Sequence, residues 1–512
     1  MESNTYVKGA LLLTLAGIVS KILSAGYRIP LQNLTGDVGF YIYQQVYPIV
    51  GIALVLALYG FPTAVSKLSA ESEELSYKHF ALPIFIILMG ICGIASVLLY
   101  VNATTLASWV GDENLVTPYK ITSIVFLFVP FSALLRGIFQ GKSDMKPTAY
   151  SQVGEQLIRV AIIITGAFMV AIYGWDIYVV GSLAGIAAIA GAFVAIIILL
   201  VFIKQYRHVP KLDKAIPWRY YVKTILTFGL IASINHMILL IIQFADATTI
   251  VSGLVAHGYS SQEAMEAKGV FDRGQPLIQI GAVFGSAFGL ALIPQVSRNV
   301  TTKQFHEQIN RGVSLSFYLA VGATVGIIFL FPEVNKLLYQ DNQGDTSLMV
   351  LMIAILLSAM AITSCSILQG MGFLKRTALI IVGSFMIKWA ANYILVPLLG
   401  ITGSAIGTIV SLLGLVIVSF LELKRNVVGI RLRKHVNWKA LLIACLSMIV
   451  FLIAVDLIAS TETFSRFELL LYVLFVSFTG GIIYFLLLVR YQAFSDKELS
   501  MLPFGSRLLR NK

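Results

Sequence analysis

The segment Leu135-Arg136-Gly137-Ile138-Phe139-Gln140-Gly141-Lys142 is partly repeated 229 positions later as Ile367-Leu368-Gln369-Gly370. The same offset matches four further pairs: Lys146 with Lys375, Thr148 with Thr377, Ala149 with Ala378, and Gly154 with Gly383. Further along, Gly181-Ser182-x-x-Gly185 is echoed by Gly403-Ser404-x-x-Gly407 at an offset of 222. Two matching halves in an apolar chain are typical of transporters whose halves rock about a shared central site.

The composition is that of a polytopic membrane protein. Of the 512 residues, 58% are hydrophobic and only 12% are charged, whereas a soluble domain has about 25% charged residues. Because about 20 apolar residues cross a bilayer as a helix, we predict an all-α membrane protein with fourteen transmembrane helices. The predicted spans are 8–27, 40–64, 79–102, 119–140, 151–173, 179–203, 221–246, 274–297, 312–331, 347–369, 377–398, 400–423, 440–458 and 467–490.

The first apolar stretch is expected to stay as a membrane span rather than to be cleaved as a signal peptide. Lys21 and Arg28 interrupt it, and a convincing small-residue cleavage site is lacking. The three cysteines, Cys92, Cys365 and Cys445, all fall inside predicted spans. They therefore support neither a disulfide framework nor a metal cluster, and we expect no metal site.

Basic residues indicate the orientation in the membrane. With the N-terminus placed in the cytoplasm, 28 of the 37 lysines and arginines fall on the cytoplasmic side. This asymmetry follows the positive-inside rule and predicts that both termini are cytoplasmic. The net charge of +12 is then mostly an orientation signal facing anionic lipid, and it requires no nucleic-acid partner.

Two basic linkers divide the chain. The predicted organisation is an N-terminal six-helix lobe (1–203), a cytoplasmic linker (204–223), a C-terminal six-helix lobe (224–423), a second cytoplasmic linker (424–439), two additional helices (440–490) and a cytoplasmic tail (491–512). Because each lobe has an even number of spans, both lobes enter from the same side. We therefore predict two parallel repeats around a central cavity, related by an axis along the membrane normal.

Several sequence blocks resemble the multidrug/oligosaccharidyl-lipid/polysaccharide exporter superfamily, and most closely its polysaccharide biosynthesis branch, which includes stage V sporulation protein B and the lipid II flippases. The resemblance covers essentially the whole chain. The matching blocks are Ser20-Lys21-Ile22-Leu23, Tyr27-Arg28-Ile29-Pro30, Tyr43-Gln44, Tyr47-Pro48, Gly60-Phe61-Pro62-Thr63-Ala64-Val65-Ser66-Lys67, Arg136-Gly137-Ile138-Phe139-Gln140-Gly141, Met145-Lys146-Pro147-Thr148-Ala149, Gln152-Val153-x-Glu155-Gln156 and Pro294-Gln295-Val296-Ser297.

The resemblance implies a flippase in the bacterial cytoplasmic membrane. Its cargo would be lipid II or another polyprenyl-diphosphate-linked polysaccharide intermediate, carried by alternating access. The expected partners are this cargo, membrane lipids and envelope-synthesis enzymes, and we expect a monomer. We expect no enzymatic activity and no cofactor other than a coupling ion, H⁺ or Na⁺. Two alternatives stay open: a proton- or sodium-coupled multidrug exporter, and a scaffold or lipid scramblase that supports envelope synthesis.

Charged residues inside predicted spans are the candidate binding residues, because a charge in a span is costly and usually faces a cavity. The candidates for the central cavity are Lys21, Arg28, Arg159, Arg273 and Lys388. The candidate acids, for ion coupling or for pairing with these cations, are Glu155, Asp246 and Asp272. Arg159 and Lys388 occupy equivalent places in the two halves. Five cations against three acids suit a diphosphate, which arginine grips in bidentate fashion, better than an organic cation.

Structural interpretations compete with several of these assignments. Arg28 could instead extend its side chain to the outer interface. Glu155 and Arg159, one turn apart, could pair with each other. Asp246, which closes the predicted seventh span, could join Asp272 and Arg273 in an ion pair at the outer surface. His236 could relay protons, but a lone histidine is more often a hydrogen-bonded residue of the helix bundle.

Two motifs are given structural interpretations. The stretch Gly137-x-x-x-Gly141-Lys142-Ser143 resembles a phosphate-binding loop but has three rather than four residues between its glycines. We therefore expect no ATP hydrolysis.

Gln140-Gly141 and Gln369-Gly370 are expected to form tight cytoplasmic turns rather than to contact cargo.

Overall fold

The computed structural model describes residues 2–72, 77–203, 216–283, 286, 303–426, 435–459 and 461–494. Within these ranges the chain is almost wholly helical and contains no strand. Among the described residues, twelve helical runs are long and apolar enough to cross a membrane. The first run, Leu12–Glu71, contains two of the predicted spans, and most of predicted span 274–297 lies outside the described residues. The all-α membrane fold is confirmed, and the twelve runs are consistent with fourteen spans.

The chain divides into two compact units, each made of two stretches of sequence. Unit 1 comprises Met1–Asp272 and Leu374–Ser404, and unit 2 comprises Arg273–Phe373 and Ala405–Lys512. The predicted linker between the two lobes lies mostly outside the described residues, because 204–215 are not among them. The predicted division into lobes therefore stays a prediction.

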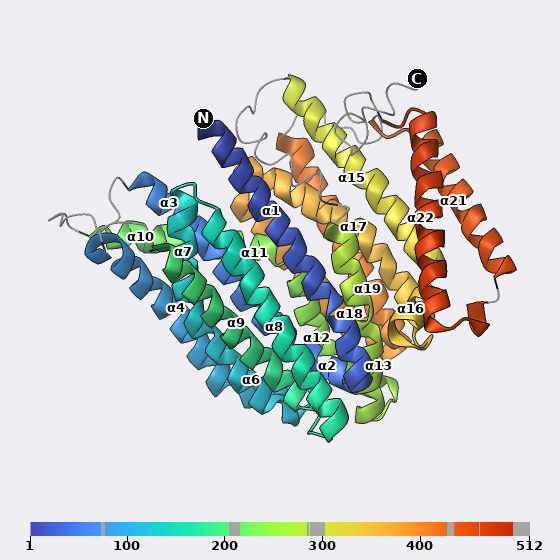
Figure 1. The fold of residues 1–512 in the computed structure, drawn as a ribbon, viewed down its shortest axis with the longest axis horizontal. Coiled ribbons are helices and arrows are strands. Elements are labelled where there is room, and N and C mark those ends of the chain that lie inside the picture. Colours follow the sequence, from blue (N-terminus) through green and yellow to red (C-terminus); the bar gives the residue numbers. More distant parts are fainter. Residues whose placement is uncertain are drawn as a thin grey trace. The chain divides into compact units, whose positions relative to one another are not determined.

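Unit 1 is built mainly from long helices that pack along one another; α8 and α9, for example, lie side by side (Figure 1). Its elements are α1 (Glu2–Gly26), α2 (Arg28–Val55), η1 (Leu56–Gly60), α3 (Phe61–Glu71), η2 (Tyr77–Ala81), α4 (Leu82–Val101), α5 (Ala103–Val110), η3 (Glu113–Leu115), α6 (Val116–Ser123), η4 (Ile124–Phe128), α7 (Val129–Gly141), α8 (Lys146–Tyr173), α9 (Val179–Ile203), α10 (Trp218–Thr224), η5 (Ile225–Leu230), α11 (Ile231–His236), α12 (Ile238–His257), α13 (Ser261–Asp272), α18 (Leu374–Leu399) and the first turn of α19 (Ile401–Asn426).

Unit 2 contains the rest of α19 and the two additional C-terminal helices, α21 and α22, which lie side by side (Figure 1). Its other elements are the helical residues 274–283, α15 (Lys303–Phe329), α16 (Phe331–Tyr339), α17 (Asp345–Gly370), α21 (Trp438–Ile458), η6 (Thr461–Thr463) and α22 (Arg466–Arg490). Ser465 and Glu468 form a reciprocal capping box that starts α22.

The sequence repeat is also a repeat of backbone hydrogen bonds. After α7, the N–H groups of Ser143 and Asp144 donate to the carbonyls of Gln140 and Phe139 at 3.0 Å each. After α17, the equivalent N–H groups donate at 2.9 Å each, from Gly372 to Gln369 and from Phe373 to Leu368. The two Gln-Gly motifs thus end helices, as predicted. The residues with positive φ are Ser143 (62°) and Gly372 (90°), two positions beyond each glycine of the motif.

Gly137 and Gly141, the two glycines of the motif that resembles a phosphate-binding loop, let α7 pack closely on α3. A Cβ added to Gly137 would lie 2.4 Å from the Cβ of Val65. A Cβ added to Gly141 would lie 2.6 Å from the Cβ of Ser69. Glycines four residues apart on one helix face allow two helix backbones to approach closely in a membrane, so the conformation and packing of this motif give it a structural role.

Two helical segments of unit 1 are wound as π-helix where they cross. They are η1, in the predicted second span, and η5, in the predicted seventh. A Cβ on Gly60 would lie 1.7 Å from the Oγ of Ser233, and one on Gly229 would lie 2.9 Å from the ring of Phe61. A π-turn leaves the regular helical hydrogen-bond pattern and often marks a functional position. The crossing therefore combines irregular helix winding with a close approach of the two segments.

Candidate functional site

A buried ion pair joins α7 to α8. Arg136 Nη2 lies 2.8 Å from Glu155 Oε2, and neither side chain is more than 3% exposed. Arg136 also donates to Ser151 Oγ at 3.1 Å and to the carbonyl of Ala57 at 3.2 Å. Arg159 instead donates to Gln156 Oε1 at 2.5 Å. The predicted pairing of Glu155 with Arg159 was therefore wrong, because the Glu155 carboxylate pairs with Arg136 of the preceding helix, α7.

The same contact corrects the place of Arg136. Arg136 is one of the 28 basic residues that the orientation prediction places on the cytoplasmic side, but it is fully buried inside α7. Its three donor interactions satisfy a guanidinium that would otherwise be costly to bury. Arg136 thus belongs to the framework of unit 1.

Arg28 is the first residue of α2 and is 0% exposed. Its guanidinium carbon lies 4.0 Å from the centroid of the Tyr47 ring, in cation–π geometry. Among the described residues, no acceptor makes a hydrogen bond of standard geometry with any of its three guanidinium nitrogens. The alternative in which Arg28 extends to the outer interface was wrong, since the group is enclosed within unit 1.

Two more cations contribute to this polar region of unit 1. The charges of Arg28 and Arg159 both act on the phenol of Tyr27, whose hydroxyl is hydrogen-bonded to that of Tyr43. Lys21 on α1 is solvent-exposed, and its charge acts on His236 at the end of α11. Arg28 and Arg159 thus lie near the same phenol, and Lys21 lies near His236.

The expected relation between Lys21 and Arg28 needs one correction. The prediction placed both on one helix, but α1 ends at Gly26 and α2 begins at Arg28. Tyr27 between them keeps helical backbone angles (φ −69°, ψ −18°), and its N–H still donates to Leu23 O. The helical rotation therefore continues through the junction, although the chain forms two elements.

The imidazole ring of His236 stacks on the ring of Tyr59. Its ring lies 4.5 Å from the Tyr59 ring, centroid to centroid, with 19° between the planes. The imidazole is exposed rather than enclosed in the bundle. The interpretation of His236 as a hydrogen-bonded bundle residue is therefore not supported by its surroundings, and its proton-relay role stays a prediction.

Asp246 lies in the middle of α12 instead of closing a span. The predicted seventh span, 221–246, is interrupted at Met237, where the backbone leaves helical geometry (φ −101°, ψ 12°). Asp246 is buried and pairs with Lys388 of α18 at 2.7 Å, and Asp272 pairs with Lys268 one turn before it on α13. The interpretation of Asp246 as part of an outer-surface pair with Asp272 and Arg273 was wrong. Continuous apolar sequence concealed the break at Met237.

Arg273, the fifth predicted cation, belongs to unit 2 and also has an acidic partner. Its two terminal nitrogens bind the two carboxylate oxygens of Asp341 at 2.5 and 3.0 Å, the bidentate geometry typical of arginine. Burial alone would raise the pKa of Asp341. The hydrogen bonds from Arg273 and from the N–H of Gln343, with the charge of Arg273, outweigh burial and lower that pKa. The pair connects the start of helix 274–283 to the loop before α17.

A charge imbalance in unit 1 emerges from these contacts. Three of its buried cations have carboxylate partners: Arg136, Lys268 and Lys388. Within the part of the chain that the structure describes, no ion pair is formed by Lys21, Arg28 or Arg159. The charge of Asp272 reaches Arg28 but is already matched by Lys268. Lys21, Arg28 and Arg159 are therefore basic groups of unit 1 that have no carboxylate partner among the described residues.

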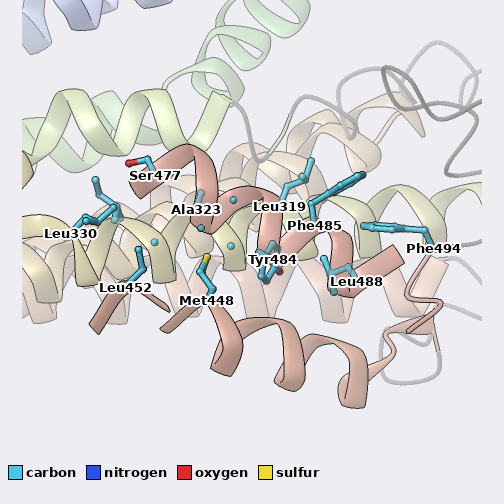
Figure 2. Close-up of a pocket in the computed structure, with 15 residues that line it drawn as sticks. Leu319, Ala323, Leu330, Met448, Leu452, Ser477, Tyr484, Phe485, Leu488 and Phe494 are labelled. Atoms are coloured by element: carbon cyan, nitrogen blue, oxygen red, sulfur yellow. The ribbon is translucent and has the colours of Figure 1, made fainter. Parts of the chain in front are cut away.

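Unit 2 holds an apolar cavity of about 380 Å³ (Figure 2). Helices α15, α21 and α22 line it, together with Phe494, and none of its lining residues is charged. Tyr484 supplies one of the few polar atoms, and its hydroxyl donates to Tyr318 O at 2.7 Å. None of the predicted site residues lies in this cavity.

Sequence reasoning missed several residues of these networks. Tyr47 and Ser404 belong to motifs described above but were not predicted to have a role. Asn392 was not predicted to be a site residue. Ser404 had a usable signal, because it belongs to the repeated Gly-Ser-x-x-Gly motif. For Asn392, the only signal in the sequence was its position one helical turn after Lys388, on α18.

Residues 6–300 match the model of the family described as polysaccharide biosynthesis protein. Over 98% of its length the chain is 35% identical to the uncharacterized membrane protein YabM of Bacillus subtilis, with 95% of that protein covered. It is 27% identical to the lipid II flippase MurJ of the same organism, over 83% of each chain. A solved lipid II flippase MurJ, in an inward closed conformation, has the same fold, with a TM-score of 0.70 and 14% identity over 94% of this chain and 99% of that one.

Proposed function

Because the chain belongs to the polysaccharide biosynthesis protein family of the exporter superfamily that its sequence resembles, we propose that it is a flippase for a polyprenyl-diphosphate-linked cell-envelope precursor. The cargo is lipid II or a polysaccharide lipid intermediate. It moves from the inner to the outer leaflet of the bacterial cytoplasmic membrane. The protein acts as a monomeric transporter with both termini in the cytoplasm, and it catalyses no covalent chemistry.

The single observation that carries this proposal is that Lys21, Arg28 and Arg159 of unit 1 form no ion pair with a described carboxylate. The diphosphate of such a cargo is esterified at both ends and bears two negative charges, and Lys21, Arg28 and Arg159 supply positive charge without ion-pair partners in the described chain. Arg28 has donors in a planar fork that suits phosphate oxygens, while Tyr47 covers its face. Arg273 and Lys388 already have carboxylate partners, so the proposed diphosphate site does not need them.

The proposed cycle is alternating access, in which the site opens first to the cytoplasm and then to the outside. The crossing of η1 and η5 at Gly60 and Ser233 supports a bending point in two spans. Lys67, on the helix that follows η1, lies 3.9 Å from the ring centroid of Phe228 in η5, so a cation–π contact also joins the two segments beside the crossing. Energy comes from an ion gradient, the membrane potential or removal of cargo outside.

A multidrug exporter coupled to protons or sodium is the second function that such a fold can perform. The charge balance of unit 1 disfavours it for organic cations, which three unpaired basic groups would repel. A scaffold or scramblase would need no group of unpaired cations such as Lys21, Arg28 and Arg159.

Proteoliposomes distinguish these functions. Purified protein would be reconstituted with a headgroup-labelled polyprenyl-diphosphate saccharide in one leaflet and, separately, with a fluorescent cationic drug. The proposal expects directional movement of the lipid and no drug transport. Drug transport without lipid movement would support the exporter, and movement of all lipids in both directions would support a scramblase. Either result would overturn the proposal.

A further inference from the structure

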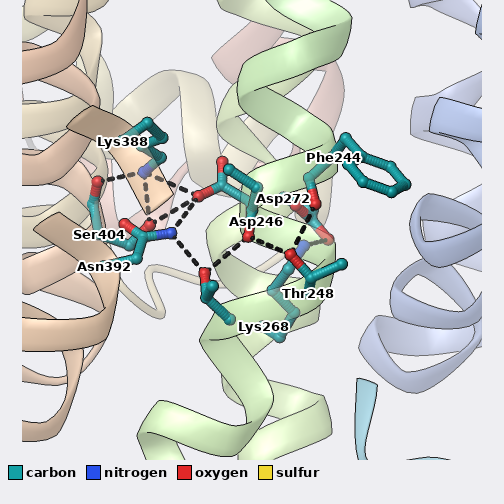
Figure 3. A network of polar contacts seen from close by, with 10 residues as sticks. Phe244, Asp246, Thr248, Lys268, Asp272, Lys388, Asn392 and Ser404 are labelled. Atoms are coloured by element: carbon teal, nitrogen blue, oxygen red, sulfur yellow. Dashed lines mark hydrogen bonds and ion pairs between the residues drawn. The ribbon is translucent and has the colours of Figure 1, made fainter. Parts of the chain in front are cut away.

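Three oxygen atoms surround the ammonium of Lys388 at hydrogen-bonding distance and form an oxygen cage (Figure 3). Its Nζ is 2.7 Å from Asp246 Oδ1, 2.8 Å from the main-chain carbonyl of Ser404 and 2.9 Å from Ser404 Oγ. An ammonium has three N–H donors, and these contacts supply three acceptors. Lys388 is fully buried, so these oxygens replace its water shell.

The cage is held by a second set of contacts. Asn392 Nδ2 donates to Asp246 Oδ1 at 2.9 Å and to Thr249 Oγ1 at 2.8 Å. Ser404 Oγ donates to the same Asp246 oxygen at 3.0 Å. Helices α12 and α18 and the first turn of α19 therefore fix the oxygens around the ammonium, independently of the lysine side chain itself.

The composition of the cage is that of a cation site. One carboxylate, one main-chain carbonyl and one hydroxyl are oxygen ligands of the kind that hard cations prefer, and transporters use main-chain carbonyls beside helix ends to hold Na⁺. Two more buried oxygens, Asp246 Oδ2 and Asn392 Oδ1, have no hydrogen-bond donor within the described residues. The cage thus offers more oxygens than one ammonium uses.

The charge of the cage is already balanced. Asp246 and Lys388 cancel each other, and the neighbouring pair of Lys268 and Asp272 is also neutral (Figure 3). An added Na⁺ would compete with the ammonium for one carboxylate, and would leave a surplus positive charge in a buried place. The ammonium is covalently tethered, so a free ion does not displace it.

We propose that Lys388 is a built-in cation that occupies an alkali-cation site between α12, α18 and the start of α19. The protein therefore binds no Na⁺ there, and shortening Lys388 while keeping Asp246 creates a Na⁺ site. The consequence for transport, that Na⁺ is not the driving ion, rests on the proposed function. The occupancy of the cage by Lys388 does not depend on the proposed function.

Thermal unfolding of the full-length protein in detergent tests the proposal. Midpoints would be compared in NaCl and in N-methyl-D-glucamine chloride at equal ionic strength, because a ligand that binds only the folded state raises the midpoint with its concentration. The wild type should show no Na⁺-specific shift. Lys388→Ala and Lys388→Asn should show a saturable one, larger for Lys388→Asn because its amide adds an oxygen ligand. Asp246→Asn combined with Lys388→Asn should abolish the shift.

Lys268→Asn is the matched control, because it also frees a buried aspartate, Asp272, but Asp272 Oδ2 is the one oxygen within hydrogen-bonding distance of the Lys268 ammonium among the described residues. It should give no saturable Na⁺ shift. Binding of ²²Na⁺ to the wild type, displaced by unlabelled Na⁺, would overturn the proposal, and so would folded Lys388 variants that do not respond to Na⁺. If both Lys388 variants fail to fold, wild-type ²²Na⁺ binding decides: none supports the built-in cation, and displaceable binding refutes it. Lipid transport does not enter any of these readouts, so failure here is separable from failure of the flippase proposal.

Discussion

The guanidinium of Arg28 lies 4.0 Å above the ring of Tyr47, nineteen positions later and beyond the break in α2 at Gly36 (φ 68°, ψ −174°). This contact keeps a buried charge in place without consuming the donors with which it would bind an anion. Aromatic faces attract a desolvated cation by about 2 kcal/mol, which offsets part of the cost of burial. Tyr47 is therefore a positioning residue for Arg28.

Replacing Tyr47 separates the ring face from the hydroxyl. Tyr47→Phe keeps the face and should bind a diphosphate lipid nearly as the wild type does. Tyr47→Leu removes it and should weaken binding by roughly tenfold or more, since about 1.4 kcal/mol is a factor of ten. Titration of a fluorescent polyprenyl diphosphate into purified protein measures both. Equal affinities for the two variants would rule out the cation–π role.

Breaking the buried pair of Arg136 and Glu155 should destabilise unit 1. Glu155→Gln leaves the guanidinium uncompensated, at a cost of about 3–5 kcal/mol, whereas replacing both residues by apolar ones of similar size is often neutral. We expect Glu155→Gln to unfold at a clearly lower temperature in detergent, and Arg136→Met combined with Glu155→Leu to regain most of the loss. A Glu155→Gln protein as stable as the wild type would show that the pair contributes nothing.

The sequence predicted the helices and their ends better than it predicted the partners of the buried charged side chains. The repeat located the turns after α7 and α17 and their hydrogen-bond pattern, because turn geometry is encoded by adjacent residues. The partner of Asp246 is Lys388, 142 positions away, and no local spacing specifies such a pair. Which of two helices supplies the cation for Glu155 likewise depends on helix rotation and packing, which apolar spans of similar composition do not reveal.

The close crossing at Gly60 predicts a steric effect. Gly60→Ala places a methyl group against Ser233 and the carbonyl of Gly229, and overpacking of this kind costs about 1–3 kcal/mol. The unfolding midpoint and transport should both fall, and adding Ser233→Gly should restore part of each. Gly90→Ala on α4 is the matched control, since nothing lies within 4 Å of the added atom. An unaffected Gly60→Ala would mean that the crossing is loose.

The predicted orientation can be read in intact cells. In a background without Cys92, Cys365 and Cys445, single cysteines would replace Lys142 and Asp176, which are exposed before and after α8. A membrane-impermeant maleimide should label position 176 from outside, and position 142 only after permeabilisation. The opposite pattern would invert the topology and place the termini outside.

The most direct test of the account is the affinity of the purified protein for a polyprenyl diphosphate, compared with the monophosphate, in the wild type and in Arg28→Ala. The account predicts that the wild type prefers the diphosphate. Arg28→Ala should lose about 1.5–3 kcal/mol, the scale of a charged hydrogen bond, or roughly tenfold to a hundredfold in affinity, with an unchanged unfolding midpoint. Arg28→Lys should keep part of the preference, since it retains the charge without the planar fork. Equal binding of both lipids by the wild type, or full affinity in Arg28→Ala, would contradict the diphosphate site.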